Sequence, residues 1–174
     1  MQTSAKFWDK VADNYARKPV SNVAAYDQTM ARTREYQHAY DHMLELGCGT
    51  GTTALRLRDA VAHVTGSDVS AQMIRIAQDK AAAEGAGNVT FVQADAAQAG
   101  DTTYDVVTAY YLFHLVRALL LALPLAQLLG KAPALYFLTE AQLHAAIEDA
   151  GFRIVETGNY PVTPASHFVV AQKV

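Results

Sequence analysis

From residue 42 onward the sequence alternates short apolar runs with stretches of helical period, and this alternation restricts the fold more than any other feature. Four apolar runs are expected to be strands, and they cover 42–46, 63–67, 88–93 and 104–110. Helical stretches follow the first two of them, at 52–61 and 70–83. Strand–helix alternation predicts a parallel sheet with helices on both faces. The run 104–110 is apolar enough to be predicted buried on both faces, as parallel strands are.

The two ends of the chain have different patterns. Near the start, Phe7, Val11 and Tyr15 lie at positions i, i+4 and i+8, which is one face of a helix. A second helix is expected over 22–40. Near the end, Thr139 opens a capping-box pattern for a helix over 139–150, and two last strands are expected at 153–158 and 166–172.

Length, charge and cysteine content exclude several classes of protein. The chain has 174 residues, of which 51% are hydrophobic, so a long disordered chain is excluded. Its formal net charge of −3 gives no attraction to nucleic acid or to anionic lipid. Cys48 is the only cysteine, so no intramolecular disulfide forms. The first residues do not form a signal peptide, and the most apolar segment, 118–129, is too short to cross a bilayer. These features predict one cytoplasmic domain.

A glycine-rich turn closes the first predicted strand. Glu45 is followed by Gly47, Gly49 and Gly51, and such glycines let a ligand approach the backbone closely. In an open α/β sheet, ligands bind outside the carboxyl ends of the strands. A dinucleotide-binding turn places its third glycine one position later, where Thr52 stands, and Glu45 would meet the charge of a pyrophosphate. An acid at this place suits a ligand that carries a positive amine, and an NAD-dependent oxidoreductase remains the alternative.

The segment Glu45-Leu-Gly-Cys-Gly-Thr-Gly51 resembles motif I of the class I S-adenosylmethionine (SAM) dependent methyltransferases. The resemblance extends over residues 6–172. It implies a Rossmann-like three-layer α/β sandwich whose sheet is mostly parallel with an antiparallel last strand, under an N-terminal helical lid. It also implies SAM as the cofactor and S-adenosylhomocysteine (SAH) as the product. The cofactor-binding residues that it implies in this segment are Glu45, Gly47, Cys48, Gly49, Thr50 and Gly51.

The second strand of the resemblance ends at an acid that would bind ribose. Asp68 lies 17 residues after Gly51, and a carboxylate accepts hydrogen bonds from both ribose hydroxyls. Its alternative role is that of a helix N-cap. Val69 follows it in the cofactor site, and Met73 resembles the apolar residue that the family places on the adenine face. A methionine packed in the core is the alternative for Met73.

Three further places in the sequence match the family's cofactor site. The resemblance implies that Asp95 accepts a hydrogen bond from the adenine amino group and that the N–H of Ala96 contacts the ring. It also implies that the chain at Tyr110 passes the methionine moiety. On the N-terminal lid, Tyr15 is expected to touch the ligand, with packing of the helix on the sheet as the alternative.

The acceptor is expected to be a small molecule. The segment Tyr110-Tyr-Leu-Phe is not the Asp/Asn-Pro-Pro-Tyr motif of enzymes that methylate amino groups of nucleic acids. Tyr111, Phe113 and the apolar stretch 119–129 favour an apolar or amphipathic acceptor. His114 is the candidate catalytic residue, as a general base or a polar substrate contact, with an ordinary partly buried histidine as the alternative. No metal site is predicted, because His38 and His42 would not share one helical face.

One part of the family's pattern is missing. After the fourth strand the family has a helix and then a fifth strand behind a Pro-Gly-Gly turn, and this sequence has neither. Residues are omitted from the sequence at this point, or the chain carries a deletion, or the stretch 119–129 replaces the lost elements. A true deletion makes turnover doubtful, so a catalytically silent SAM-binding or scaffold protein is a second alternative. The predicted single domain over 1–174 has four parts: a lid (1–41), a SAM-binding core (42–115), an apolar cap (116–138) and a C-terminal helix with a strand hairpin (139–174).

Overall fold

The computed structural model describes residues 2–94, 103–110, 139–163 and 165–174. The chain divides into two compact units. The first unit consists of Met1–Pro19 and Arg34–Ala134, and the second consists of Val20–Thr33 and Leu135–Val174. The expected single domain over the whole chain, with its four parts, therefore stays a prediction.

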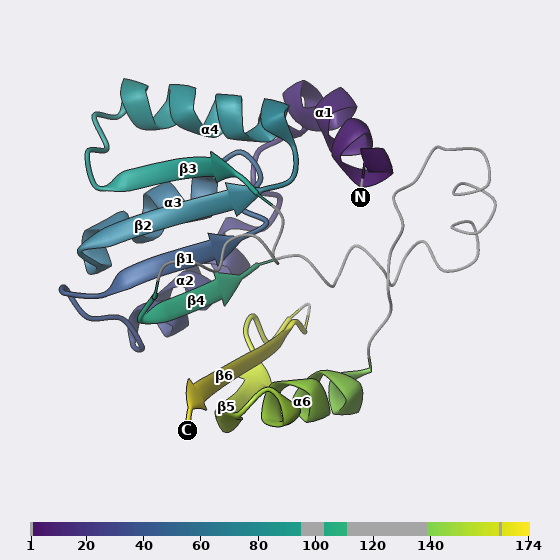
Figure 1. The fold of residues 1–174 in the computed structure, drawn as a ribbon, viewed down its shortest axis with the longest axis vertical. Coiled ribbons are helices and arrows are strands. Elements are labelled where there is room, and N and C mark those ends of the chain that lie inside the picture. Colours follow the sequence, from purple (N-terminus) through teal and green to yellow (C-terminus); the bar gives the residue numbers. More distant parts are fainter. Residues whose placement is uncertain (1, 95–102, 111–138, 164) are drawn as a thin grey trace. The chain divides into compact units, whose positions relative to one another are not determined.

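The first unit contains a parallel sheet of four strands among its described residues (Figure 1). The strand order is β3-β2-β1-β4, and every pair in it is parallel. Its elements, in chain order, are α1 (Gln2–Ala16), β1 (His42–Leu46), α3 (Thr52–Leu57), the 3-10 helix η1 (Arg58–Ala60), β2 (His63–Asp68), α4 (Ala71–Ala83), β3 (Val89–Gln93) and β4 (Val106–Ala109). This arrangement confirms the predicted α/β class and the parallel sheet.

The register of the strands brings their carboxyl ends to one edge of the sheet. Leu46 at the end of β1 pairs with Ser67 of β2 and with Ala109 of β4, while Asp68 pairs with Gln93 of β3. The chain runs outward from β1 through β2 to β3 and then crosses to β4 on the other side of β1. The strand order therefore reverses at β1, and ligands of open α/β sheets bind at such a point.

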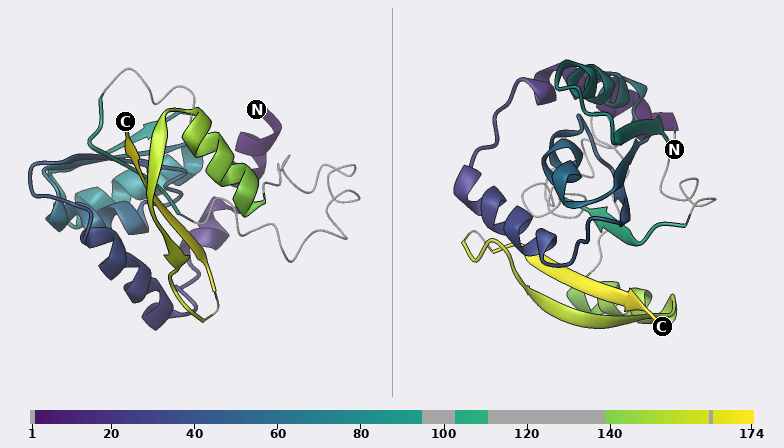
Figure 2. Two further views of the ribbon diagram at one scale, coloured as in Figure 1. Left: turned by 90° about the horizontal axis from the view of Figure 1, so that it is seen from below. Right: turned by 90° about the vertical axis from the view of Figure 1, so that its left-hand side faces the viewer.

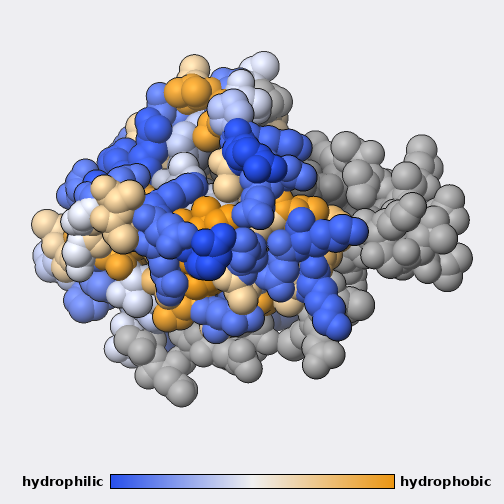
Figure 3. All heavy atoms as spheres, turned by 90° about the horizontal axis from the view of Figure 1, so that it is seen from above, coloured by the Kyte–Doolittle hydropathy of each residue, from blue (hydrophilic) through white to orange (hydrophobic). Residues whose placement is uncertain are grey.

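The core of the first unit lies where α3 and α4 cover the sheet. Met43, Val64 and Leu57 are fully buried there, and Phe91 of β3 packs among them with 5% exposure. The side of α4 that faces solvent is polar, with Arg75, Gln78 and Asp79 exposed. Figure 3 views the molecule from the side of α4 and α1, and hydrophilic residues dominate that face.

The helix α4 begins where the sequence predicts it. Ser70 is its N-cap, and the Ser70 hydroxyl accepts a hydrogen bond from the backbone N–H of Met73. The stretch predicted as one helix over 52–61 is divided instead. It forms α3 and then a turn of 3-10 helix, because the chain must turn back quickly to enter β2.

The second unit contains an antiparallel pair of strands with two helices. Its elements are α2 (Val23–Arg34, whose last residue belongs to the first unit), α6 (Glu140–Asp149), β5 (Phe152–Asn159) and β6 (His167–Lys173). The capping box at Thr139 and Gln142 is present at the start of α6, as the sequence predicts. Arg32 of α2 makes a forked ion pair with Glu156 of β5, with 2.7 Å between Arg32 Nη2 and Glu156 Oε2. Figure 2 gives two further views of these elements.

Two expectations about the elements were wrong. The helix expected over 22–40 ends at Arg34, because residues 38–41 form a turn in which the buried carboxylate of Asp41 accepts the backbone N–H of His38 at 2.7 Å. The run 104–110 was expected to be buried on both faces, but Val107 is 57% exposed. The strand β4 lies at the edge of the sheet that the described residues form, so no neighbouring strand of this sheet shields its outer side.

Among the described residues, none of the helices combines the length and the apolar character that crossing a membrane requires.

Candidate functional site

The loop from Gly47 to Gly51 joins β1 to α3 at the edge where the strands end. Gly47, Gly49 and Gly51 all have positive φ angles, of 64°, 53° and 75°. A side chain at Gly51 would also collide with the core, because an added Cβ would lie 2.5 Å from Phe91 Cζ and 2.8 Å from Ala77 Cβ. This glycine therefore serves both a left-handed backbone and a close approach of β3 and α4.

Glu45 carries its carboxyl group into the protein beneath this loop. Its exposed fraction is 2%, and it accepts a hydrogen bond from the backbone N–H of Ala54 in α3. Its second oxygen, Oε2, is buried and has no hydrogen-bond partner among the residues that the structure describes. Burial raises the pKa of Glu45 to about 8, and the nearby charge of Asp68 acts in the same direction. A buried acid with one free oxygen is an unusual arrangement that a polar or cationic ligand would satisfy.

Asp68 ends β2 and ties the loop to the next helix. Its Oδ2 accepts the backbone N–H of Gly49 at 3.0 Å, and its Oδ1 accepts that of Ser70 at 2.8 Å. Ser70, not Asp68, is the N-cap of α4, so the alternative role considered for Asp68 was wrong. Burial raises the pKa of Asp68, the backbone hydrogen bonds from Ser70, Gly49 and Val69 oppose this, and the charge of Asp9 adds to it. A carboxylate has about four acceptor positions, so these three backbone donors do not use all of them.

Tyr15 lies on the last turn of α1, close to the loop. Its ring atom Cε1 would be 3.8 Å from a Cβ added at Gly49, and the side chain is half exposed. Partial burial raises the pKa of the Tyr15 phenol, and the carboxyl groups of Asp68 and Glu45 raise it further. Tyr15, Glu45 and Asp68 therefore share one electrostatic environment around the loop.

Cys48 contributes to the loop as a small buried residue. Its backbone N–H donates to the carbonyl of Ser67 at 2.9 Å, and its sulfur lies 3.1 Å from the position of a Cβ added at Gly66. Burial raises the pKa of the Cys48 thiol, with Glu45 and Asp68 as further causes. The thiol therefore stays protonated and is not a nucleophile.

A residue that sequence reasoning missed holds α1 at the site. Asp9 Oδ1 accepts the hydroxyl of Ser70 at 2.6 Å and the backbone N–H of Gln72 at 3.0 Å, so a carboxylate from α1 binds the N-terminus of α4. The partners are more than 60 residues apart in sequence. No local pattern in the sequence indicates such a contact between distant residues.

Replacing Asp9 by alanine is expected to loosen α1 from α4. The substitution removes two hydrogen bonds to a charged group, each worth about 1.5–3 kcal/mol, and α1 should then exchange its amide hydrogens faster than the sheet does. Hydrogen exchange measured by mass spectrometry checks this. Asp13→Ala is the matched control, because Asp13 is exposed and makes only a 3.3 Å contact with Gln72 Nε2. Equal exchange of α1 in the two variants would contradict the role of Asp9.

Of the other predicted site residues, three lie in the described part of the chain, and the rest lie outside it. Val69 follows Asp68, and Tyr110 follows the end of β4, beside the loop that starts after Leu46. Met73 is 2% exposed in the first turn of α4, as the alternative of a core methionine requires, and its place at an adenine ring stays a prediction. Outside the described residues lie Asp95, Ala96, Tyr111, Phe113, His114 and the predicted cap 116–138.

Comparison with known proteins indicates the same class of protein as the sequence of the glycine loop does, a methyltransferase. Residues 43–127 match the family described as a methyltransferase domain. The uncharacterized methyltransferase YcgJ of Bacillus subtilis (strain 168) is 32% identical over 87 residues, which is 49% of this chain and 34% of that protein. The chain spans less than two fifths of the length of the two curated relatives that it matches.

Solved structures share the fold over nearly the whole chain. Magnesium protoporphyrin IX methyltransferase (ChlM) from Synechocystis PCC 6803, solved with bound SAM, has a TM-score of 0.69 and 23% identity, and the match covers 98% of this chain and 95% of that one. DhpI in complex with SAH has a TM-score of 0.70 and 20% identity, with 99% and 96% of the two chains covered. Residues 43–127 are therefore similar to a methyltransferase domain, and the fold of the chain is similar to that of these two solved proteins.

Proposed function

We propose that this protein transfers a methyl group from SAM to a small, apolar or amphipathic acceptor. The observation that carries the proposal is the buried, unpartnered oxygen of Glu45 beneath the glycine loop. An ammonium group placed there would satisfy that oxygen and would favour the ionised carboxylate. SAM has such an ammonium on its methionine moiety, and its ribose supplies two hydroxyl donors for Asp68.

The residues present fit SAM by their chemistry. Glu45 would hold the amine, Asp68 the ribose, and Tyr15 would lie over the loop from the side of α1. The carboxyl groups of Glu45 and Asp68 beside the loop make an environment that favours a cation, and the bound cofactor carries a positive sulfonium. SAM supplies an electrophilic methyl group, so the chain has to hold the donor and the acceptor in line and keep water out.

The nature of the acceptor rests on the sequence. The apolar residues Tyr111 and Phe113 and the stretch 119–129 favour an acceptor with apolar surface. His114 would serve as a base only where the acceptor must lose a proton. The solved relative ChlM is named as a methyltransferase of magnesium protoporphyrin IX, which is consistent with a small-molecule acceptor of amphipathic character.

Measurements of ligand binding distinguish methyl transfer from two other functions. An NAD-dependent oxidoreductase would bind NADH and would have to accept the pyrophosphate charge near Glu45. A catalytically silent protein would bind SAM and SAH without turnover. Calorimetric titration with SAM, SAH and NADH, followed by an acceptor panel, distinguishes the three. We expect binding of SAM and SAH but not of NADH, and tight binding of NADH alone would contradict the proposal.

Replacing Asp68 by asparagine is expected to weaken SAM binding about 10- to 100-fold, as the loss of hydrogen bonds to a charged group does. Asp68 also accepts a hydrogen bond from the backbone of Gly49, so the substitution disturbs the loop as well as the ribose contact. A second ligand is needed to separate these two effects. A SAH analogue without the 2′-hydroxyl should bind wild type more weakly than SAH does. In Asp68→Asn the two ligands should bind alike. An equal loss in both proteins would remove Asp68 from the ribose site.

A further inference from the structure

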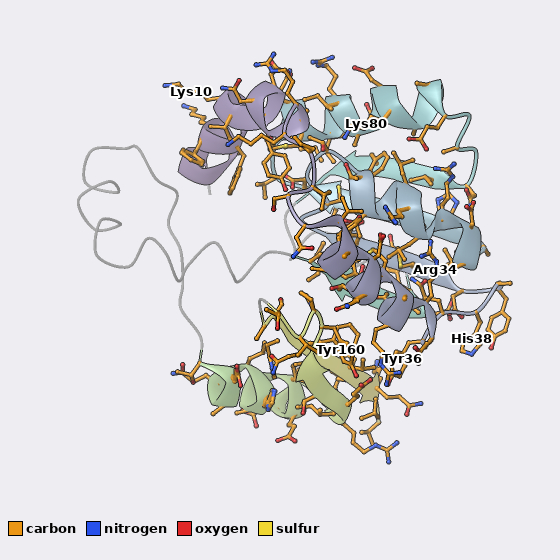
Figure 4. All side chains as sticks on the ribbon, turned by 180° about the vertical axis from the view of Figure 1, so that it is seen from behind. Lys10, Arg34, Tyr36, His38, Lys80 and Tyr160 are labelled. Carbon is orange, nitrogen blue, oxygen red and sulfur yellow. The ribbon has the colours of Figure 1, made fainter. Side chains whose placement is uncertain are left out.

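The glycine loop is held from behind by α4 as well as from the strand edge. Ala77 of α4 packs against Gly51 at the distance already described. One turn further along α4, Lys80 directs its Nζ to the hydroxyl of Thr50 at 3.0 Å and to that of Thr52 at 3.1 Å. Thr50 is a buried residue of the loop, and Thr52 is the first residue of α3. One ammonium thus joins α4, the loop and the start of α3 (Figure 4).

We infer that Lys80 is a positioning residue of the cofactor site, which fixes the glycine loop in its ligand-binding conformation without touching the ligand. The inference rests on the proposed function. Three residues with positive φ give the loop a backbone that the free chain adopts rarely, and glycines lose more conformational freedom on folding than other residues. Contacts from outside the loop therefore have to hold it. Asp68 supplies one at Gly49, Ser67 supplies one at Cys48, and Lys80 supplies another at Thr50 and Thr52.

The surroundings of Lys80 favour its hydrogen bonds to Thr50 and Thr52. Lys80 borders a groove of about 360 Å³ between α3 and α4, whose walls also include Arg56, Arg58 and Glu84. Partial burial lowers the pKa of Lys80, while the charge of Glu84 opposes this. A partly desolvated ammonium interacts more strongly with the hydrogen-bond acceptors that it retains. The carboxylate of Glu84 pairs with Arg58 at 2.5 Å, and Lys80 donates to the two threonine hydroxyls.

Charge alone predicts the opposite effect on SAM. Removing a cation near the site should strengthen the binding of SAM, which carries a net positive charge, and should leave the binding of SAH, whose net charge is zero, nearly the same. Loss of the loop's position should instead weaken the binding of SAM and the binding of SAH by the same factor. The comparison of SAM with SAH therefore separates a positioning role from an electrostatic one.

The experiment measures the dissociation constants of SAM and SAH by calorimetry for wild type, Lys80→Met, Lys80→Arg and Arg75→Met. We expect Lys80→Met to weaken both ligands about tenfold, because a charge-assisted pair of hydrogen bonds is lost. Lys80→Arg should restore both to within about threefold of wild type, since a guanidinium also donates to two acceptors. Arg75→Met is the matched control, as it removes a cation from the same helix whose partners are Asp79 and Gln72 of that helix, away from the loop.

A second variant keeps the test independent of how Lys80→Met folds. Thr52→Val removes one acceptor at an exposed position, and its effect should not add to that of Lys80→Met in the double variant. Unchanged dissociation constants in Lys80→Met, or stronger binding of SAM only, would overturn the role of Lys80 while the proposed function stands. Failure of wild type to bind SAM and SAH would overturn both.

Discussion

Gly51→Ala is expected to lower the free energy of unfolding by about 3 kcal/mol, which is about 10 °C in Tm for a chain of this size. Two effects add. The φ angle of 75° is strained for a residue with a Cβ, and the new methyl group would lie 2.5 Å from Phe91 and 2.8 Å from Ala77. Both neighbours belong to the packed core between β3 and α4, so neither can move away freely. Urea or thermal unfolding measures the change.

Gly85→Ala is the matched control for this prediction. Gly85 ends α4 with a φ of 62°, but no atom lies within 4 Å of an added Cβ. It carries the backbone strain without the steric collision, so the expected loss is about 1 kcal/mol. Equal losses in the two variants would show that Gly51 is present for its backbone angle alone, and the close packing of the loop against Phe91 would not matter.

Glu45→Gln is expected to remove a strong dependence of stability on pH. The folded protein raises the pKa of Glu45 from 4.5 to about 8, so between these values the folded state binds a proton that the unfolded state has released. The stabilisation is complete below about pH 4.5 and is lost as pH rises through about 8. Over this window wild type should lose up to about 5 kcal/mol through Glu45.

Glutamine keeps an oxygen for the N–H of Ala54 but does not titrate. The difference in unfolding free energy between wild type and Glu45→Gln, measured by urea unfolding from pH 5 to pH 8.5, isolates this group from all others. The variant should become the more stable protein as pH rises. Asp68, whose pKa is also raised, acts in the same direction and remains in both proteins. A constant difference across this range would contradict a protonated Glu45 in the folded state.

The sequence predicted the parts of the site that depend on local pattern. The order of strands and helices after residue 42, the N-cap at Ser70 and the capping box at Thr139 all follow from period and from capping chemistry. The glycine loop and Asp68 were placed at one edge because parallel strands bring their carboxyl ends together. The structure confirms that edge through the pairing of β1 with β2 and β4.

The remaining parts depend on contacts between distant residues, which no local pattern contains. Asp9 and Lys80 support the site from α1 and α4, and their partners lie 28 or more residues away. The burial of Glu45, and with it the raised pKa of its carboxyl group, follows from the packing of α3 over β1. The exposed Val107 shows a third case, because an apolar strand does not reveal from its sequence whether it lies at a sheet edge.

The number of protons released when SAM binds tests directly whether Glu45 binds the ammonium of SAM. At pH 7 the Glu45 carboxyl of the free protein is mostly protonated, because its pKa is about 8. An ammonium beside it would favour ionisation, so SAM binding should release about one proton. Calorimetry in buffers of different ionisation enthalpy gives that number. We expect close to one proton for wild type and none for Glu45→Gln, whereas SAM binding without proton release in wild type would contradict the role of Glu45.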